Sequence, residues 1–259
     1  SVTSHEIAHT WFQFLMATNE SKHSWMDEGF TSYIDDVAMN VILNEGKALP
    51  NANAYKDYFR WVATGLEEPM TTHADRFKFN TGYGMSAYDK GSIFLSQLQY
   101  IIGKENFDNT LKKYFNDWSF RHPKPNDFIR SAEKVSGLEL DWYLLDWAQS
   151  TMTIDYSINS VYGVDNKTKI VLKRIGQMGM PIDVRIVLES GDYLDYNIPM
   201  TKMRGSKPLN NSTLLDSWSW AKPYYEFWIN IDSKDVSKIL IDPKNEMADI
   251  DRINNSLDL

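Results

Sequence analysis

The sequence predicts an α+β multidomain protein, with an all-helical part over residues 1–150 and a β-sheet part over residues 151–259. Apolar residues recur at helical spacing up to about residue 150, and at every second position after Thr151. The 259 residues are enough for two domains, and 42% hydrophobic residues are typical of a globular protein. We expect the second part to be a small antiparallel β-sandwich.

The helical part shows periodic apolar faces and several end signals. Helices are expected to include residues 7–15 and 30–41 and to lie near residues 51–65, 87–102, 105–118, 126–136 and 139–149. The segments Ser24–Asp27 and Ser86–Asp89 have the form of capping boxes, which predicts that helices begin there. Gly103 and Gly137 stand where helix C-terminal glycines belong.

The second part alternates apolar and polar residues. Strands are expected at residues 154–158, 169–173, 182–188, 227–231 and 236–241. Turn residues at 163–166 and 189–192 separate successive strands, and segment 204–222, which mixes Gly, Ser, Pro and Asn, is expected to be a long loop.

Composition excludes several classes of protein. The 27 Lys and Arg against 35 Asp and Glu leave a net charge of −8, which argues against nucleic-acid binding because phosphates require a basic face. No apolar run approaches the roughly 20 residues of a transmembrane helix. The chain has no cysteine, so disulfides and thiolate metal sites are excluded. A cysteine-free chain favours a bacterial periplasmic or extracellular location, with a cytoplasmic one left open.

Residues 5–9 read His-Glu-Ile-Ala-His. Positions i and i+4 of a helix share one face, so His5 and His9 can offer two imidazole nitrogens to one metal ion. Glu6 would stand beside that ion, where its carboxylate can take a proton from water. The alternative is an amphipathic helix that carries two histidines at a domain interface.

A third ligand candidate follows in the sequence. A catalytic zinc ion binds three protein side chains and keeps one position open. Glu28 follows His9 after 18 residues, at the expected start of the next helix. This interval lets the first helix end and a second return toward the metal. Alone, Glu28 could be a surface residue that stabilises the helix dipole, but its combination with His5 and His9 favours a ligand.

The segments HEIAHTWF and WMDEGF resemble the signature of the aminopeptidase N-like zinc aminopeptidases, gluzincin metallopeptidases that include the leukotriene-hydrolase branch. The resemblance implies that His5, His9 and Glu28 bind one zinc ion and that Glu6 is the general base. The segment AYDKG resembles the family's Tyr-x-Lys-Gly, which implies that Tyr88 donates a hydrogen bond to the oxyanion of the reaction.

The resemblance also implies an architecture. Residues 1–150 would be the helical part of a thermolysin-like catalytic domain, followed by the small sandwich. The family's Gly-x-Met-Glu-Asn strand, which binds the substrate's amino group, has no match in the chain. We therefore expect the C-terminal portion of a longer protein, whose missing N-terminal portion is a partner of this one. Alone, the chain is expected to be a poor aminopeptidase and to self-associate through apolar faces around Trp11, Phe12 and Phe30.

The leading hypothesis is a zinc metallopeptidase that removes N-terminal residues from peptides. The alternatives are epoxide hydrolysis at the same zinc site and a non-catalytic module that binds a partner or carbohydrate. Asp27 could orient a zinc ligand, although its place in a capping box favours a helix cap. Lys90 is expected to anchor the helix that carries Tyr88. Trp11, Trp25 and Tyr83 are candidates to line a substrate cleft, although aromatic residues near a helix start usually belong to the core.

Overall fold

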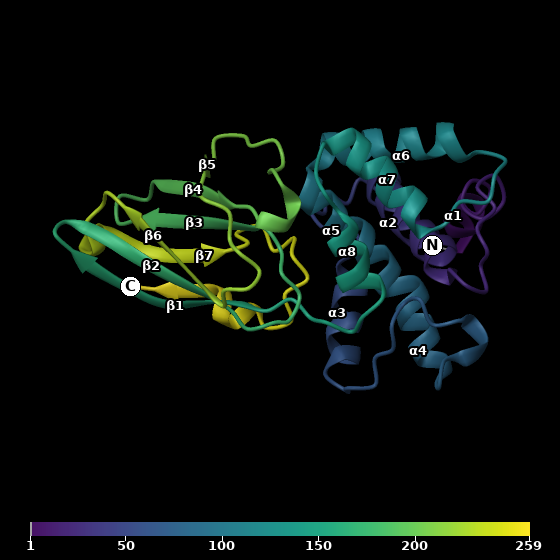
Figure 1. The fold of residues 1–259 in the computed structure, drawn as a ribbon, viewed down its shortest axis with the longest axis horizontal. Helices are drawn as coiled ribbons and strands as arrows, with labels where there is room; N and C mark the ends of the chain where they lie inside the picture. Colours follow the sequence, from purple (N-terminus) through teal and green to yellow (C-terminus); the bar gives the residue numbers. More distant parts are fainter. Residues whose placement is uncertain (1) are drawn as a thin grey trace. The chain divides into compact units, whose positions relative to one another are not determined.

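The computed structural model describes residues 2–259, which form two compact units, one ending at Thr151 and the other spanning Met152–Leu259 (Figure 1). The first unit is built of helices and the second of two sheets, so the α+β class predicted from the change of period is confirmed. None of the helices within residues 2–259 is long and apolar enough to cross a membrane.

The first unit, coloured purple to teal in Figure 1, contains eight α-helices within the described residues. They are α1 (Val2–Ala8), α2 (Phe30–Ile42), α3 (Ala52–Val62), α4 (Asn80–Gly84), α5 (Gly91–Ile102), α6 (Lys104–Trp118), α7 (Pro125–Ser136) and α8 (Asp141–Tyr143). The unit also contains three π-helical turns in the part of the chain that the structure describes. The turn Trp25–Gly29 leads into α2, the turn Met85–Lys90 leads into α5, and the turn Leu144–Ala148 follows α8. The helices predicted after residue 50 are all present, and most of their ends lie within about three residues of the expected ones.

The first helix is shorter than its apolar pattern predicts. It ends at Ala8 rather than near residue 15, and Ile7 and Trp11 of the predicted face are 55% and 42% exposed. Beyond α1, the N–H groups of Phe14, Leu15 and Met16 donate to carbonyls five residues back instead of four, and Gln13 takes a positive φ of 92°. The following segment bonds elsewhere, since the N–H of Ala17 donates to the carbonyl of Arg121. The periodicity of apolar residues does not indicate that a distant segment, at Arg121, binds the backbone here.

The predicted helix ends are partly correct. Gly137 closes α7 with a φ of 73°, and Gly103 closes α5 with a φ of 83°, as glycines at these positions should. A helical turn begins at Trp25, as the segment Ser24–Asp27 predicted, but neither predicted capping box forms. The side chain of Ser24 makes no capping hydrogen bond, and Ser86 lies inside a helical run that begins at Asn80.

A cluster of buried aromatic rings forms the core of the helical unit. Phe30 at the start of α2 packs on Phe128 of α7, with ring centroids 4.9 Å apart. Trp25 packs on Phe94 of α5 at 4.8 Å. These contacts hold the turn that carries Glu28 against α5 and α7. Phe30 is fully buried, so the predicted exposure is wrong for this residue, whereas Trp11 is exposed as predicted.

The second unit, coloured teal to yellow in Figure 1, contains two sheets. One has the order β1-β2-β6, formed by Tyr156–Val164, Lys167–Arg174 and Tyr224–Ile229. The other has the order β5-β4-β3-β7-β8, formed by Thr213–Leu214, Tyr193–Ile198, Ile182–Leu188, Val236–Ile241 and Ser256–Asp258. The five predicted strands are present as β1, β2, β3, β6 and β7. The sequence missed β4 and the short strands β5 and β8.

Strand pairing in the second unit departs from the prediction at one edge. All pairs are antiparallel except β4 with β5, which run parallel, so the sheets are not wholly antiparallel. Along β3, Ile182, Val184 and Ile186 are buried and alternate with partly exposed residues, as a period of two requires. Tyr196 of β4 contacts Phe227 of β6, with centroids 5.5 Å apart, and so joins the two sheets.

Candidate metal centre

The three predicted metal ligands converge. Ligand atoms of His5, His9 and Glu28 all lie within 4.8 Å of one another. The Glu28 Oε2 atom is 3.1 Å from His5 Nε2 and 3.5 Å from His9 Nε2. Ligand atoms around a tetrahedral zinc ion with bonds of about 2.1 Å are about 3.4 Å apart. Two imidazoles and one carboxylate at these separations fit a single zinc ion.

Local hydrogen bonds place the two histidines. The N–H of His9 donates to the carbonyl of His5 at 3.3 Å, so the helical i, i+4 spacing persists just beyond the end of α1. The hydroxyl of Ser4 donates to Asp35, and Thr31 Oγ1 lies 3.4 Å from His5 Nε2. These contacts join α1 to α2, immediately after the turn that carries Glu28.

Asp27 belongs to this centre. Its Oδ1 atom lies 2.7 Å from His9 Nδ1, on the side of the ring opposite Nε2. Burial raises the pKa of Asp27 to about 7, the nearby His9 opposes that rise, and the Glu28 charge adds to it. The cap that the sequence favoured for Asp27 is therefore wrong. In place of a helix cap, Asp27 makes a tertiary contact with His9, and this contact orients a candidate ligand.

Tyr88 stands at the edge of the centre. Its ring lies nearly parallel to that of His5, with centroids 5.8 Å apart and an interplanar angle of 14°. Burial raises the pKa of Tyr88, and a hydrogen bond with the Glu28 carboxylate raises it further. The phenol therefore stays protonated at neutral pH and can act as a hydrogen-bond donor.

The remaining candidate site residues differ in their exposure to water. Glu6 lies on α1 directly after His5 and is exposed, so its carboxylate is accessible to water. Trp25 is fully buried in the aromatic core and cannot line a cleft. Tyr83 is half-buried, and its pKa is raised by burial and then by the charges of Glu28 and Asp27, which places it near the centre.

A buried ion pair anchors the segment that carries Tyr88. Lys90 Nζ lies 2.5 Å from Glu67 Oε1, and the two side chains are 2% and 6% exposed. Lys90 also donates to the carbonyl of Ser150 at 3.3 Å and lies 5.4 Å from the ring centroid of Trp147. Burial lowers the pKa of Lys90, and the Glu67 carboxylate counteracts this. The sequence predicted the anchoring role of Lys90 but contained no signal for Glu67.

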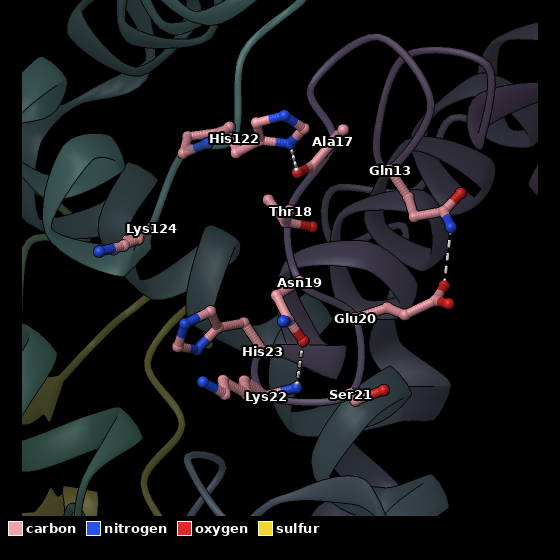
Figure 2. A pocket seen from close by; sticks show the side chains of 11 residues that line it. Gln13, Ala17, Thr18, Asn19, Glu20, Ser21, Lys22, His23, His122 and Lys124 are labelled. Atoms are coloured by element: carbon pink, nitrogen blue, oxygen red, sulfur yellow. Dashed lines mark hydrogen bonds between the residues drawn. The ribbon is translucent and has the colours of Figure 1, made fainter.

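A polar pocket of about 590 Å³ lies beside the loop that joins His9 to Glu28. It is lined by residues of two segments, Gln13–His23 and His122–Lys124, and it includes none of the candidate ligands. Figure 2 shows the contact that joins the two segments, His122 Nδ1 with the Ala17 carbonyl at 2.9 Å. Within the first segment, Gln13 Nε2 donates to Glu20 at 2.7 Å and the N–H of Lys22 donates to Asn19 at 3.1 Å. The pocket is therefore separate from the convergent ligands.

Comparison with known proteins points to one family. Human aminopeptidase B is 29% identical over 164 residues, which cover 55% of this chain and 25% of that protein. Aminopeptidase M1 of Arabidopsis thaliana is 24% identical over 225 residues, or 85% of this chain and 24% of that protein. The chain thus spans about a quarter of the length of these relatives.

A solved structure has a similar fold. The crystal structure of Legionella pneumophila aminopeptidase A in complex with aspartic acid matches 89% of this chain and 24% of its own, at 19% identity and a TM-score of 0.55. The family model for the peptidase family M1 domain matches residues 1–147, which include the whole convergent centre. This match covers more than half of the chain, and the chain therefore belongs to peptidase family M1.

Proposed function

We propose that the chain carries the zinc site and catalytic groups of an aminopeptidase that removes N-terminal residues from peptides. The observation that carries the proposal is the convergence of His5, His9 and Glu28 beside Tyr88. The aminopeptidase names of the relatives support the substrate class.

The proposed zinc ligands are His5 and His9, through Nε2, and a carboxylate oxygen of Glu28. Zinc, when bound, polarises the scissile carbonyl and lowers the pKa of the attacking water. Asp27 holds the Nδ1 side of His9, which leaves Nε2 directed toward Glu28. The ligand set leaves one position open, as a catalytic site requires.

Two side chains would move or hold protons. Glu6 accepts a proton from the attacking water and passes it to the leaving amine, a role that suits an exposed carboxylate next to a ligand. Tyr88 donates its phenolic proton in a hydrogen bond to the carbonyl oxygen as negative charge develops there. Its raised pKa keeps that proton in place.

The finer description of the fold belongs to the same proposal. The helical unit would be the helical part of a thermolysin-like catalytic domain, and the second unit a β-sandwich. The similar fold of the Legionella aminopeptidase, which extends over both units, supports this assignment.

The proposal is tested in the natural protein that carries this sequence, by zinc content and by hydrolysis of an aminoacyl anilide. Glu6→Gln should keep one zinc per chain and lower kcat by about 10²–10⁴-fold, because the amide cannot accept the proton. Tyr88→Phe should lower kcat by about 10²–10³-fold with zinc unchanged. The matched controls, Glu105→Gln on α6 and Tyr162→Phe on β1, should leave both quantities unchanged. Near-normal kcat in Glu6→Gln would contradict the assignment of the base.

A further inference from the structure

Two glycines bring the segments of Glu28 and Tyr88 into backbone contact. A methyl group added at Gly29 would lie 2.6 Å from the Cα atom of Gly91 and 2.9 Å from the carbonyl oxygen of Ala87. One added at Gly91 would lie 2.8 Å from the Cα atom of Gly29 and 3.2 Å from the carbonyl oxygen of Trp25. In both directions the obstructing atoms are backbone, so no flexible side chain can move aside.

Each glycine stands at the C-terminal end of a π-helical turn of the candidate metal centre. Gly29 ends the turn that carries Glu28, and Gly91 begins α5 after the turn that carries Tyr88. The π-helix is rare and is found mostly as single turns, often at functional sites. Here two such turns meet where only glycine fits.

Neighbouring side chains prevent the Glu28 turn and the Tyr88 turn from moving apart. Trp25, beside Gly91, is fully buried and packed against Phe94 at 4.8 Å. Lys90, the residue before Gly91, is held by its buried pair with Glu67. A densely packed interior transmits a displacement instead of absorbing it. A methyl group at either glycine would therefore shift one turn relative to the other.

We propose that the Gly29–Gly91 contact is a positioning device, which sets the place of the Glu28 carboxylate relative to the Tyr88 phenol. The inference rests on the proposed function, because it assigns Glu28 to the metal and Tyr88 to the reacting carbonyl. Gly29 and Gly91 are positioning residues, since they act through the turns that they join. A substitution on the Tyr88 segment should consequently be detected at the metal ligand on the other segment.

Gly84 supplies a matched control. It stands directly before the Tyr88 turn, has a helical conformation, and a methyl group added there would meet no atom within 4 Å. Gly84→Ala therefore makes the same chemical change in the same segment without pressing on the Glu28 turn. Alanine also has the higher helix propensity, so this variant should fold at least as well.

The experiment titrates Co²⁺ into the full chain and its variants, without any assay of activity. The visible bands of bound Co²⁺ depend on the geometry of its ligands. Gly91→Ala and Gly29→Ala should each shift these bands and weaken Co²⁺ binding by about 10–100-fold, as loss of a residue that orients a ligand does. Gly84→Ala should give the spectrum and affinity of the unsubstituted chain.

The outcomes separate the two proposals. If the unsubstituted chain binds no Co²⁺, the proposed zinc site is wrong and the positioning role is wrong with it. If it binds Co²⁺ and Gly91→Ala and Gly29→Ala share its spectrum and affinity, only the positioning role is overturned. Circular dichroism checks folding. If neither variant folds, a crystal structure of the unsubstituted chain decides, because separated backbones at Gly29 and Gly91 would overturn the inference and close contact would support it.

Discussion

The two units of the chain bury carboxylates for different purposes. In the helical unit, Asp27 faces the imidazole of His9 at the candidate metal centre. In the β unit, Asp242 and Asp249 each accept two backbone N–H groups. Asp242 holds its own turn, whereas Asp249 binds the N–H of Asp251 in its turn and that of Tyr156 at the start of β1. Burial raises the pKa to about 7 for Asp27 and Asp242, and to about 6 for Asp249. A raised pKa therefore does not identify a functional site; the partner of the carboxylate does.

The ion pairs of the two units differ in the same way. The pair of Lys90 and Glu67 is buried under the Tyr88 segment. The pair of Arg185 and Asp195 joins β3 to β4 through two hydrogen bonds of 2.7 and 2.8 Å, but its side chains remain 26% and 25% exposed. Water screens the Arg185–Asp195 pair and not the Lys90–Glu67 pair, so loss of the buried pair should cost more stability although the partly exposed pair makes more hydrogen bonds.

The largest expected effect distinguishes a ligand histidine from a surface one. His9→Ala should abolish stoichiometric zinc binding, because it leaves only two protein ligands. His122→Ala removes an exposed histidine of the polar pocket and should leave binding unchanged. Zinc content after dialysis measures both. Full zinc occupancy in His9→Ala would contradict the assignment of His9 as a zinc ligand.

The second effect concerns stability. Lys90→Met leaves Glu67 buried without its partner and should lower the free energy of unfolding by about 3–5 kcal/mol. Arg185→Met breaks the partly exposed pair and should cost about 1 kcal/mol or less. Urea unfolding followed by circular dichroism compares the two variants. Equal losses would show that exposure does not separate these pairs.

The third effect compares the two carboxylates that share a pKa. Asp27→Asn should weaken zinc binding by about 10–100-fold, because the amide orients His9 less well than the carboxylate does. Asp242→Asn should leave zinc affinity unchanged while it reduces stability, since its amide nitrogen cannot accept the N–H of Glu246 or Met247. Competition with a metal-sensitive dye measures affinity. Weaker zinc binding in Asp242→Asn would contradict the purely structural role assigned to Asp242.

The fourth comparison concerns the pH dependence of the β unit. The pKa of Asp242 rises from 3.8 to about 7 on folding, chiefly because the carboxyl group is buried. Between these values the folded chain holds the proton that the unfolded chain has lost, so the contribution of Asp242 to the free energy of unfolding falls as pH rises from about 4 to about 7.

Above about pH 7 this contribution is constant, because both states have lost the proton. The difference in the free energy of unfolding between the unsubstituted chain and Asp242→Asn should follow the same course. Urea unfolding of both chains across this pH range measures it. A difference that is flat or rises with pH would contradict the assigned direction.

The sequence by itself determined the α+β division and named the residues of the candidate metal centre. The change of period at Thr151 separated helices from strands, since side chains repeat every 3.6 residues in one and every two in the other. The spacing of His5, His9 and Glu28 predicted the residues that converge. Both signals are local, because each needs only a regular backbone and a short return of the chain.

The tertiary structure alone decided where α1 ends, what Asp27 contacts and why residues 29 and 91 are glycines. Each depends on a segment distant in sequence: the carbonyl of Arg121 accepts the N–H of Ala17, and the backbone of Gly91 lies against that of Gly29. The strands β4, β5 and β8 were missed for a related reason. Two are very short and β4 is only partly buried, so pairing with a neighbour, and not apolar periodicity, makes them strands.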